Sequence, residues 1–550
     1  MSDESLDGLG RKLMPIEIKI LAAVGIIAAR PFELMGNAGW RGGPRAELNR
    51  DRGAGRHGLL RRDRDLPGAR LLCCRAEAAV DADLKGKDLV ILSHSALAAL
   101  SLTALLMISA CAAVGPDPSE LPQTRLQAAF DEGGAAPLGQ VGTNAFWSGY
   151  QDRTLSRLIA DGLDTSLDII TANERIRAAA ADLQATQPLA AQITGEPASA
   201  SRVRSGGDGV STGYSSTASL SAGFVFDLFG GARRAREGAA AAYASAEAQV
   251  QVTRLAWLAE VIGAYSDARY NQQALALTRE TIRAREATLE VTRNMLSLGL
   301  ATDYDIAQTE ALLQTAQADL PAFEAQFSAQ VYRLSTLLNQ QAGPLTATMQ
   351  AGSGALRIPP GPGTGVPAEL LRNRPDVRAA QQDLAQALAA VGVATADLLP
   401  SLSLTGTVSD QGGGTGWGFG PRLSLPVANQ GVLQASRTRR LSEARSADLA
   451  WRSSVAAAVE DVQTAQSNLR RLRQRVAALD QAAASYDRAY DLASTNFEAG
   501  ALPLIDLLDA DRQRAAARLQ AASARNDAAR EWAALQISTG AGAAVARIAD

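Results

Sequence analysis

The sequence predicts a mainly α-helical chain with a few short β-strands, built as two copies of one unit. A segment RAAAADL at 177–183 recurs as RAAQQDL at 378–384, an offset of 201 residues. A turn-like segment GLATDYD at 299–305 recurs as GALPLID at 500–506 with the same offset. A long internal period is the mark of duplication.

Two similar halves follow from this repeat, at 146–345 and 346–545. Each half shows the same order of signals. A helix (168–186 in the first half, 375–398 in the second) precedes two short alternating segments joined by glycine and serine. A very long helix, a glycine turn and a second long helix come next.

The short segments have the period of β-strands. In 401–408 apolar side chains stand at alternate positions, except at Gly406, and the same alternation appears in 417–425 and 218–226. Side chains of a strand alternate between faces, so one face is apolar and the other is small and polar. This pattern fits a membrane barrel with lipid outside and water inside, although a soluble sheet with one buried face gives the same pattern.

The long helices have a coiled-coil pattern. No proline interrupts Arg233–Leu298. In the second half, a strict seven-residue step and a partner row three positions on define one seam: Val455, Val462, Leu469, Val476 and Ala483 with Ala458, Ala465, Leu472, Leu479 and Tyr486. Its many alanines permit close helix approach. About 65 residues at roughly 1.5 Å each make a rod of about 100 Å, which indicates a tube or stalk.

Composition excludes most enzyme chemistry from the downstream part. Beyond Cys111 the chain contains no lysine, histidine or cysteine. A His–Cys metal site, a Ser–His dyad, a cysteine nucleophile and a Schiff-base lysine are therefore excluded there. Carboxylate chemistry alone is left, as in a wall hydrolase, but no compact paired-acid cleft is indicated. We expect no enzyme and no metal, and the net charge of −3 gives no reason to expect nucleic acid as a partner.

A lipoprotein signal is predicted before Cys111. The apolar run Ala96–Ala110 has fifteen residues, whereas a membrane-spanning helix needs roughly 20. Lys85 and Lys87 form a basic flank. The run ends in ISAC, which resembles a bacterial lipobox, where small residues precede a cysteine that is acylated. The alternative is a buried structural cysteine after an ordinary leader.

The N-terminal region divides accordingly. We expect residues 80–110 to be the signal peptide and residues 111–145 to be a lipidated N-terminal segment, with covalent lipid on Cys111 and no cofactor. Residues 1–79 contain arginine-rich and glycine-rich stretches without sustained periodicity. We expect them to be absent from the mature protein, with translation starting near Val80 or Leu84.

Several motifs together resemble the TolC/OprM family of outer-membrane factors. The segment CAAVGPD at 111–117 resembles the start of lipidated members. FVFDLFGG at 224–231 and LSLPV at 423–427 resemble the strand-to-helix junctions of the two halves. RPDVR at 374–378 and LPS at 399–401 also match, and the resemblance covers about residues 111–545.

The resemblance implies a fold and a function. Three identical subunits would form a 12-stranded β-barrel continued by a 12-helix coiled-coil tunnel, anchored in the outer membrane of a Gram-negative bacterium and extending into the periplasm. It would be the passive exit duct of a tripartite efflux or secretion system, with a periplasmic membrane-fusion adaptor and an inner-membrane pump of the RND type. The alternative is a lipid-anchored adaptor, but adaptors have one hairpin flanked by sheet-rich domains.

The resemblance also implies two sets of site residues. The adaptor would contact the helix turns at Gly299, Leu300, Gly500 and Ala501. Paired acids at Asp506 and Asp509 would form two carboxylate rings in a trimer, a constriction attractive to cations. The alternative is that these acids have no role in a gate and are solvated charges near the start of a helix, where acidic residues are favoured.

At the gate, one further position matches the family, and two positions differ from it. Asp305 matches an acidic residue that ties the closed state together. Where some members have a gating tyrosine and arginine, this chain has Phe497 and Leu502. Neither side chain pairs with a carboxylate, so we expect the closed gate to rely on hydrophobic packing.

Overall fold

A computed structural model describes 113–117, 126–132, 136–186, 192–205, 211–351, 354–361, 363, 365–411 and 414–544. All described residues belong to the unit Val90–Asp550. The predicted upstream segment, the signal peptide and Cys111 lie outside the described residues.

Each half contains one very long helix followed by one of about half its length. The long helices are α6 (Gly231–Ser297) and α11 (Gln430–Glu498), of 67 and 69 residues. The shorter ones are α7 (Asp303–Leu337) and α12 (Leu504–Ser538), both of 35 residues. The end of α6 and both ends of α7 correspond to those of α11 and α12 at the offset of 201 found in the sequence.

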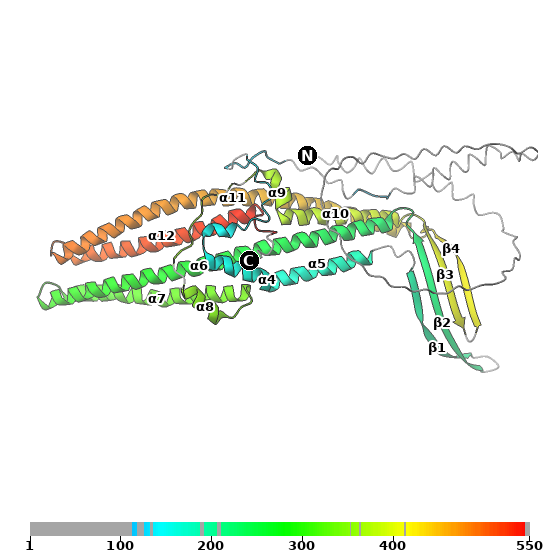
Figure 1. The fold of residues 1–550 in the computed structure, drawn as a ribbon, viewed down its shortest axis with the longest axis horizontal. Helices are drawn as coiled ribbons and strands as arrows, with labels where there is room; N and C mark the ends of the chain where they lie inside the picture. The colour runs from blue at the N-terminus through cyan, green and yellow to red at the C-terminus, as the bar shows by residue number, and fades with distance from the viewer. Residues whose placement is uncertain are drawn as a thin grey trace, which may run out of the picture. The chain divides into compact units, whose positions relative to one another are not determined.

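Shorter helices cover the remaining length of α6 and α11. The helix α5 (Leu167–Ala185) packs on α6, and α10 (Pro375–Ala396) packs on both α6 and α11. The helix α12 contacts α6 as well as α11. Figure 1 shows α6 and α11 running in the same direction with α12 and α10 between them, the hairpin turns at one end and the sheet at the other. Both helices predicted to precede the strands are thus present.

The predicted seam of α11 is buried along its first part. Val455, Ala458 and Val462 are buried, as are Ala465 and Leu469. Tyr486, predicted for the same seam, is 38% exposed. The seven-residue step then continues beyond the predicted range to two further buried positions, Ala493 and Phe497. The seam therefore reaches the turn at the end of α11.

Short elements surround the long helices near their middle. They are η2 (Phe146–Tyr150), α4 (Arg153–Thr165), α8 (Ala342–Ala351) and α9 (Pro367–Asn373). They contribute to the main hydrophobic core together with Trp257, Trp451 and Trp532. Tyr150 Oη donates to Ala529 O at 2.6 Å and Trp532 Nε1 donates to Pro360 O at 2.9 Å. These bonds attach the connecting segments to α12.

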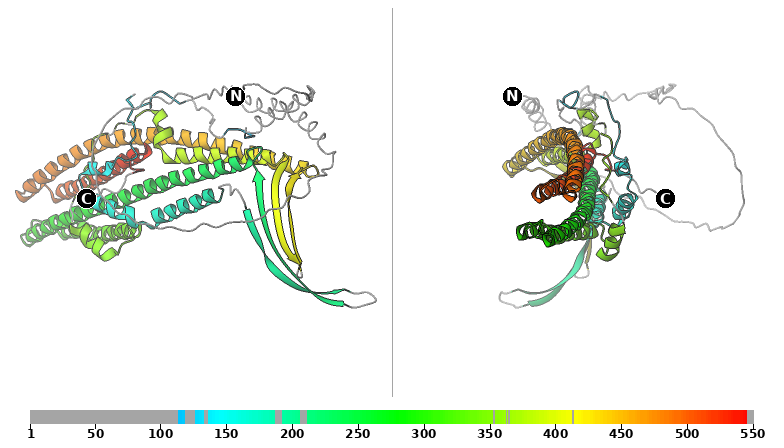
Figure 2. Two further views of the ribbon diagram at one scale, coloured as in Figure 1. Left: turned by 45° about the vertical axis from the view of Figure 1, so that its right-hand side comes forward. Right: turned by 90° about the vertical axis from the view of Figure 1, so that its left-hand side faces the viewer.

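The strands form one antiparallel sheet in the order β1-β2-β3-β4. Their bounds are β1 (Gln192–Ser205), β2 (Ser211–Phe226), β3 (Ser401–Gln411) and β4 (Gly414–Ser424). The central β2–β3 pairing joins the two halves of the chain. Figure 2 shows the four strands as a single curved layer. Within the described part of the chain, β1 and β4 each pair on one side only.

The register places the alternating apolar positions on one face, whereas Val225 lies on the other. Three rows cross β2, β3 and β4: Leu220, Val408 and Trp417; Ala222, Gly406 and Phe419; Phe226, Leu402 and Leu423. The opposite face carries small and polar residues, such as the row Ser221, Thr407 and Gly418. Trp417 is 81% exposed. An apolar face this exposed favours contact with lipid over burial in a soluble sheet.

Gly406 breaks the alternation for a local reason. A Cβ at Gly406 would lie 3.5 Å from the Phe419 ring. The Phe419 ring thus stands over the position that the missing side chain leaves on the apolar face, as when a cross-strand aromatic covers a strand glycine. None of the described helices combines the length and apolarity that crossing a membrane requires.

Glu369 fixes the start of α9 to the N-terminal connecting segment. It is buried and accepts backbone N–H donors from Leu138 at 3.0 Å, Gly139 at 2.7 Å and Val366 at 3.2 Å. Burial alone would raise the pKa of this carboxyl. The three N–H donors and the nearby Arg372 stabilise the charged form more strongly and hold its pKa below the usual value.

Glu369→Gln should lower the free energy of unfolding by about 2 kcal/mol at neutral pH, because bonds to a charged acceptor are lost. The folded-state pKa is depressed, so this stabilisation is present above the ordinary glutamate pKa and is lost as pH falls through the folded value. Denaturant unfolding at several pH values measures it. Glu324→Gln, at an exposed ion pair with Arg279, is the control. A difference from wild type that persists unchanged in acid would contradict this assignment.

Candidate functional site: the tips of the two helical hairpins

Both long helices end in the same turn. Gly299 and Gly500 have φ of +73° and +74°, a conformation that glycine adopts without steric cost. In each turn the glycine N–H and the next N–H donate back into the last helical turn: Gly299 to Leu296 O at 2.9 Å and Leu300 to Met295 O at 2.8 Å; Gly500 to Phe497 O at 2.9 Å and Ala501 to Asn496 O at 2.8 Å. This is a Schellman cap, made twice.

The four predicted adaptor-contact residues all lie at these tips and are all exposed. The two tips differ in side chains. The first presents Leu298 and Leu300, which are 73% and 74% exposed, and Tyr304, which is 72% exposed. The second presents Gly500 and Ala501, with Leu502 half-buried and Ile505, the counterpart of Tyr304, 48% exposed. The first hairpin thus has the larger apolar surface at its end.

Asp305 caps the start of α7. Thr302 N–H donates to Asp305 Oδ2 at 2.8 Å, and Asp305 N–H donates to Thr302 Oγ1 at 3.3 Å. This reciprocal pair is a capping box, which satisfies two backbone donors at the helix start. The sequence pattern T-D-Y-D could have indicated this role. A part for Asp305 in closing the gate remains a prediction.

Asp506 and Asp509 are both exposed on the first turns of α12. Asp506 lies in the first turn, where a carboxylate interacts favourably with the helix dipole. Asp509 pairs with Arg512 of the same helix at 2.9 Å. The three-residue spacing places both acids on one side of α12, as the sequence predicted.

Phe497 is buried rather than presented at the tip. It belongs to a small apolar core, here called the tip cluster: Ala493, Phe497, Leu504, Leu507 and Leu508. Val291, Met295 and Leu312 of the first hairpin pack against it, and so does Leu502. At this level the two hairpins of one subunit are therefore joined by hydrophobic contact.

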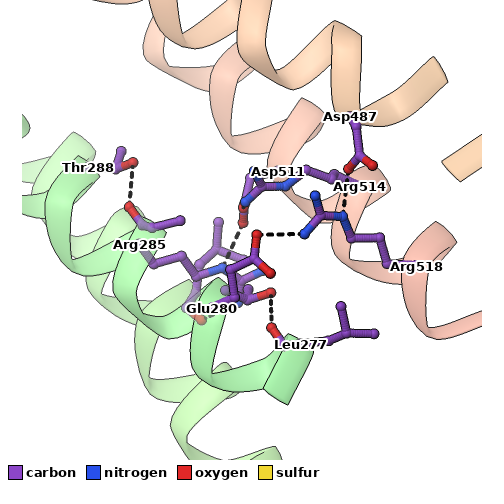
Figure 3. Close-up of polar contacts among 11 residues, drawn as sticks. Leu277, Glu280, Arg285, Thr288, Asp487, Asp511, Arg514 and Arg518 are labelled. Atoms are coloured by element: carbon purple, nitrogen blue, oxygen red, sulfur yellow. Dashed lines mark hydrogen bonds and ion pairs between the residues drawn. The ribbon is translucent and has the colours of Figure 1, made fainter. Parts of the chain in front are cut away.

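A buried group of charges lies below the tip cluster, and sequence reasoning missed it. Arg285 Nε of α6 meets Asp511 Oδ2 of α12 at 2.7 Å, and Arg514 Nη2 meets Asp511 Oδ1 at 3.3 Å. These three residues are here called the charge cluster (Figure 3). All three are buried, Asp511 being only 3% exposed. Removing one partner of such a pair costs about 3–5 kcal/mol, because a buried charge is left unpaired.

The charge cluster touches all four hairpin helices. Arg285 Nη1 donates to Leu312 O of α7 at 2.5 Å, and the Arg514 guanidinium lies 3.5 Å from the centre of the Tyr490 ring of α11.

A second group of ion pairs lies nearby, where Glu280 of α6 and Asp487 of α11 pair with Arg518 of α12 at 2.7 and 2.6 Å. Partial burial alone would lower the pKa of Arg518, but the two carboxylates raise it above its usual value.

No signal in the sequence separates these buried charges from the many exposed ones on the same helices. Among the residues with described positions, no group of histidine, cysteine and acidic side chains is arranged to hold a metal ion. The site therefore consists of two structurally equivalent tips and an exposed pair of acids, with the tip cluster and the charge cluster connecting the hairpins.

The family model described as "Outer membrane efflux protein" matches residues 158–340 and 366–541. The chain belongs to this family. It is 34% identical over 453 residues to nodulation protein T of Rhizobium leguminosarum bv. trifolii, covering 80% of the chain and 96% of the relative. It is 31% identical over 387 residues to the pyoverdine export outer membrane protein OpmQ of Pseudomonas putida, covering 67% of the chain and 81% of the relative.

Solved structures agree with this membership. The outer-membrane channel OprN superposes with a TM-score of 0.71 at 26% identity, covering 78% of this chain and 99% of that one. The CmeC outer membrane channel of Campylobacter jejuni has a TM-score of 0.70 at 19% identity, covering 80% and 96%, which supports the fold alone.

The protein is therefore an outer-membrane channel subunit of a Gram-negative bacterium that extends into the periplasm. Its fold is that of the trimeric channels, in which three sheets close a 12-stranded barrel and the helices continue it as a tunnel. It serves as the exit duct of a tripartite efflux or secretion system, and the alternative of a periplasmic adaptor is set aside. Family members are channels rather than enzymes, and they work as homotrimers with adaptors and inner-membrane pumps.

Proposed function

We propose that the two hairpin tips of this chain are its contact surface for a periplasmic membrane-fusion adaptor. The duplicated turn supports the proposal most directly, because Gly299 and Gly500 end their helices with the same bonds and the same backbone angle. A trimer would present two such tips from each subunit, and a repeated adaptor hairpin would find equivalent positions. The exposed Leu298 and Leu300 would supply apolar contact area at the first tip.

The pump that we propose behind the adaptor is of the RND type, on the strength of the resemblance to the TolC/OprM family. The relatives' names include pyoverdine export and toluene efflux. Molecules so different in polarity, exported through related channels, favour cargo selection by the pump, with this channel as a passive conduit.

A photo-reactive residue placed at Leu300 or Ala501 should cross-link in cells to a membrane-fusion adaptor, identified by mass spectrometry. The same residue at Tyr332, exposed on α7 away from the tips, should give no adaptor cross-link. Equal cross-linking from Tyr332, or none from either tip, would contradict the assignment of the contact surface.

The acids of α12 are proposed to form a cation-attracting constriction in the trimer. Asp506 and Asp509 are exposed on one side of the helix, close to the turn. Rings of carboxylates attract cations and bind multivalent ones most strongly. Phe497, by its burial in the tip cluster, would support the closed gate through packing.

Replacing Asp506 and Asp509 together by alanine should reduce block of the channel by polyvalent cations in a planar bilayer. Asp319→Ala, at an exposed acid of α7, should leave the block as in wild type. A double variant that is blocked as strongly as wild type would remove the acids from this role.

The lipid anchor is proposed at Cys111, and the residues just after it support this position. Val114 N–H donates to Phe229 O at 3.1 Å, and Arg234 Nε donates to Val114 O at 3.3 Å. A Cβ at Gly115 would lie 2.6 Å from Gly392 Cα, so the backbones touch. This segment is fixed where β2 leads into α6.

Cys111→Ser should abolish covalent lipid, because only the thiol accepts the diacylglyceryl group. Intact mass spectrometry of the purified mature chain measures this as the loss of the acyl groups. The same spectrum shows whether residues 1–79 are present. Ser109→Ala, which keeps a small residue before the cysteine, is the control. A Cys111→Ser protein with the wild-type acyl mass would contradict the anchor.

A further inference from the structure

The tip cluster and the charge cluster connect the two hairpins of one subunit at successive levels. Arg285 lies twelve residues before the end of α6, and Asp511 lies seven residues after the start of α12. At about 1.5 Å per residue, the charge cluster is about 18 Å from the first turn and about 10 Å from the second. The tip cluster fills the space between the charge cluster and the turns.

The contacts between hairpins change in kind at the charge cluster. Just beyond it the side chains of Thr288 and Tyr490 share a hydrogen bond across the hairpins. From there to the tips, the side chains that join the hairpins in the described structure are the apolar ones of the tip cluster and its neighbours. The ion pairs at this level stay within one hairpin, Arg293 with Glu310 at 2.7 Å and Asp509 with Arg512 at 2.9 Å. The charge cluster, by contrast, is directional and crosses from one hairpin to the other.

These two kinds of contact resist movement differently. Apolar side chains have no directional requirement, so Phe497 and its neighbours can repack as helices slide. Arg285 and Arg514 share one carboxylate, and Arg285 also binds a backbone carbonyl of α7. Separating α6 from α12 at this level would leave the buried Arg285 guanidinium without its anion, whereas Arg514 would stay with Asp511 on α12 (Figure 3).

We propose that the charge cluster is a fixed joint of the gate. The two hairpins of one subunit stay together at Arg285, Asp511 and Arg514, while the distance between their tips changes by repacking of the tip cluster. Movement is confined to the last turns of α6 and α11 and the first turns of α7 and α12. With Phe497 and Leu502 at its tip, this chain needs no polar contact between the hairpins there, because the ion pairs of the charge cluster already connect them farther from the turns.

Pairs of spin labels test this proposal in the purified trimer, since the chain beyond Cys111 contains no cysteine of its own. One pair, Ser297→Cys with Glu498→Cys, reports on the tips. The other, Glu286→Cys with Gln513→Cys, reports on the joint. All four positions are exposed and outside both clusters. Pulsed electron paramagnetic resonance gives the distance distribution of each pair in lipid nanodiscs.

We expect a narrow distribution within each subunit at the joint and a broader one at the tips. Asp511→Asn should broaden the joint distribution, whereas Glu290→Gln, at an exposed acid five residues from Arg285, should leave it narrow. Equal widths at joint and tips in the wild-type sequence would overturn the proposal, even if Asp511→Asn fails to assemble. An assembled Asp511→Asn trimer with an unbroadened joint would overturn it as well.

Discussion

The architecture depends on the backbone hydrogen bonds of a four-stranded sheet with two open edges. Strands β1 and β4 pair on one side only within the described part of the subunit, and the apolar face bears the exposed Trp417 and Phe419. In lipid, each unpaired backbone group costs several kcal/mol, so an open sheet is not a stable membrane structure. Joining β4 of one subunit to β1 of the next in a threefold ring removes every edge.

The helices continue what the sheet begins. Strand β2 leads into α6 and β4 leads into α11, so each long helix is attached to a strand at one end and a Schellman turn at the other. The connection between halves is repeated along this path. It is made by the β2–β3 ladder in the sheet, by α10 between α6 and α11, and by Arg285 with Asp511 near the tips. The two duplicated halves of one subunit are therefore joined to each other by noncovalent contacts along their whole length.

Local periodicity predicted much of this fold. The 201-residue repeat predicted equivalent turns at Gly299 and Gly500, and α6 and α11 do end just before them. The heptad positions from Val455 to Leu469 are buried as expected. Alternation in the strands identified the apolar face. The short elements α8 and α9 were not foreseen, because they are held by long-range contacts such as Glu369 with Gly139. Burial of Tyr486 was expected and is not found.

The positions of the two hairpin turns were predicted correctly, and their contact with an adaptor stays a prediction. The turns at Gly299 and Gly500 were located because glycine in a left-handed conformation is a local signal. The buried partners of Asp511 could not be predicted, because an aspartate three residues before an arginine on a helix looks like an exposed pair. Only the packing of α6 against α12 shows that Arg285, 226 positions away in the sequence, meets it.

Native mass spectrometry of the detergent-solubilised protein tests the closure of the sheet most directly. The account predicts an assembly of three chain masses that persists until the detergent shell is removed, and that conducts ions when added to a lipid bilayer. A monodisperse single chain that remains in solution without detergent and carries no current would contradict it.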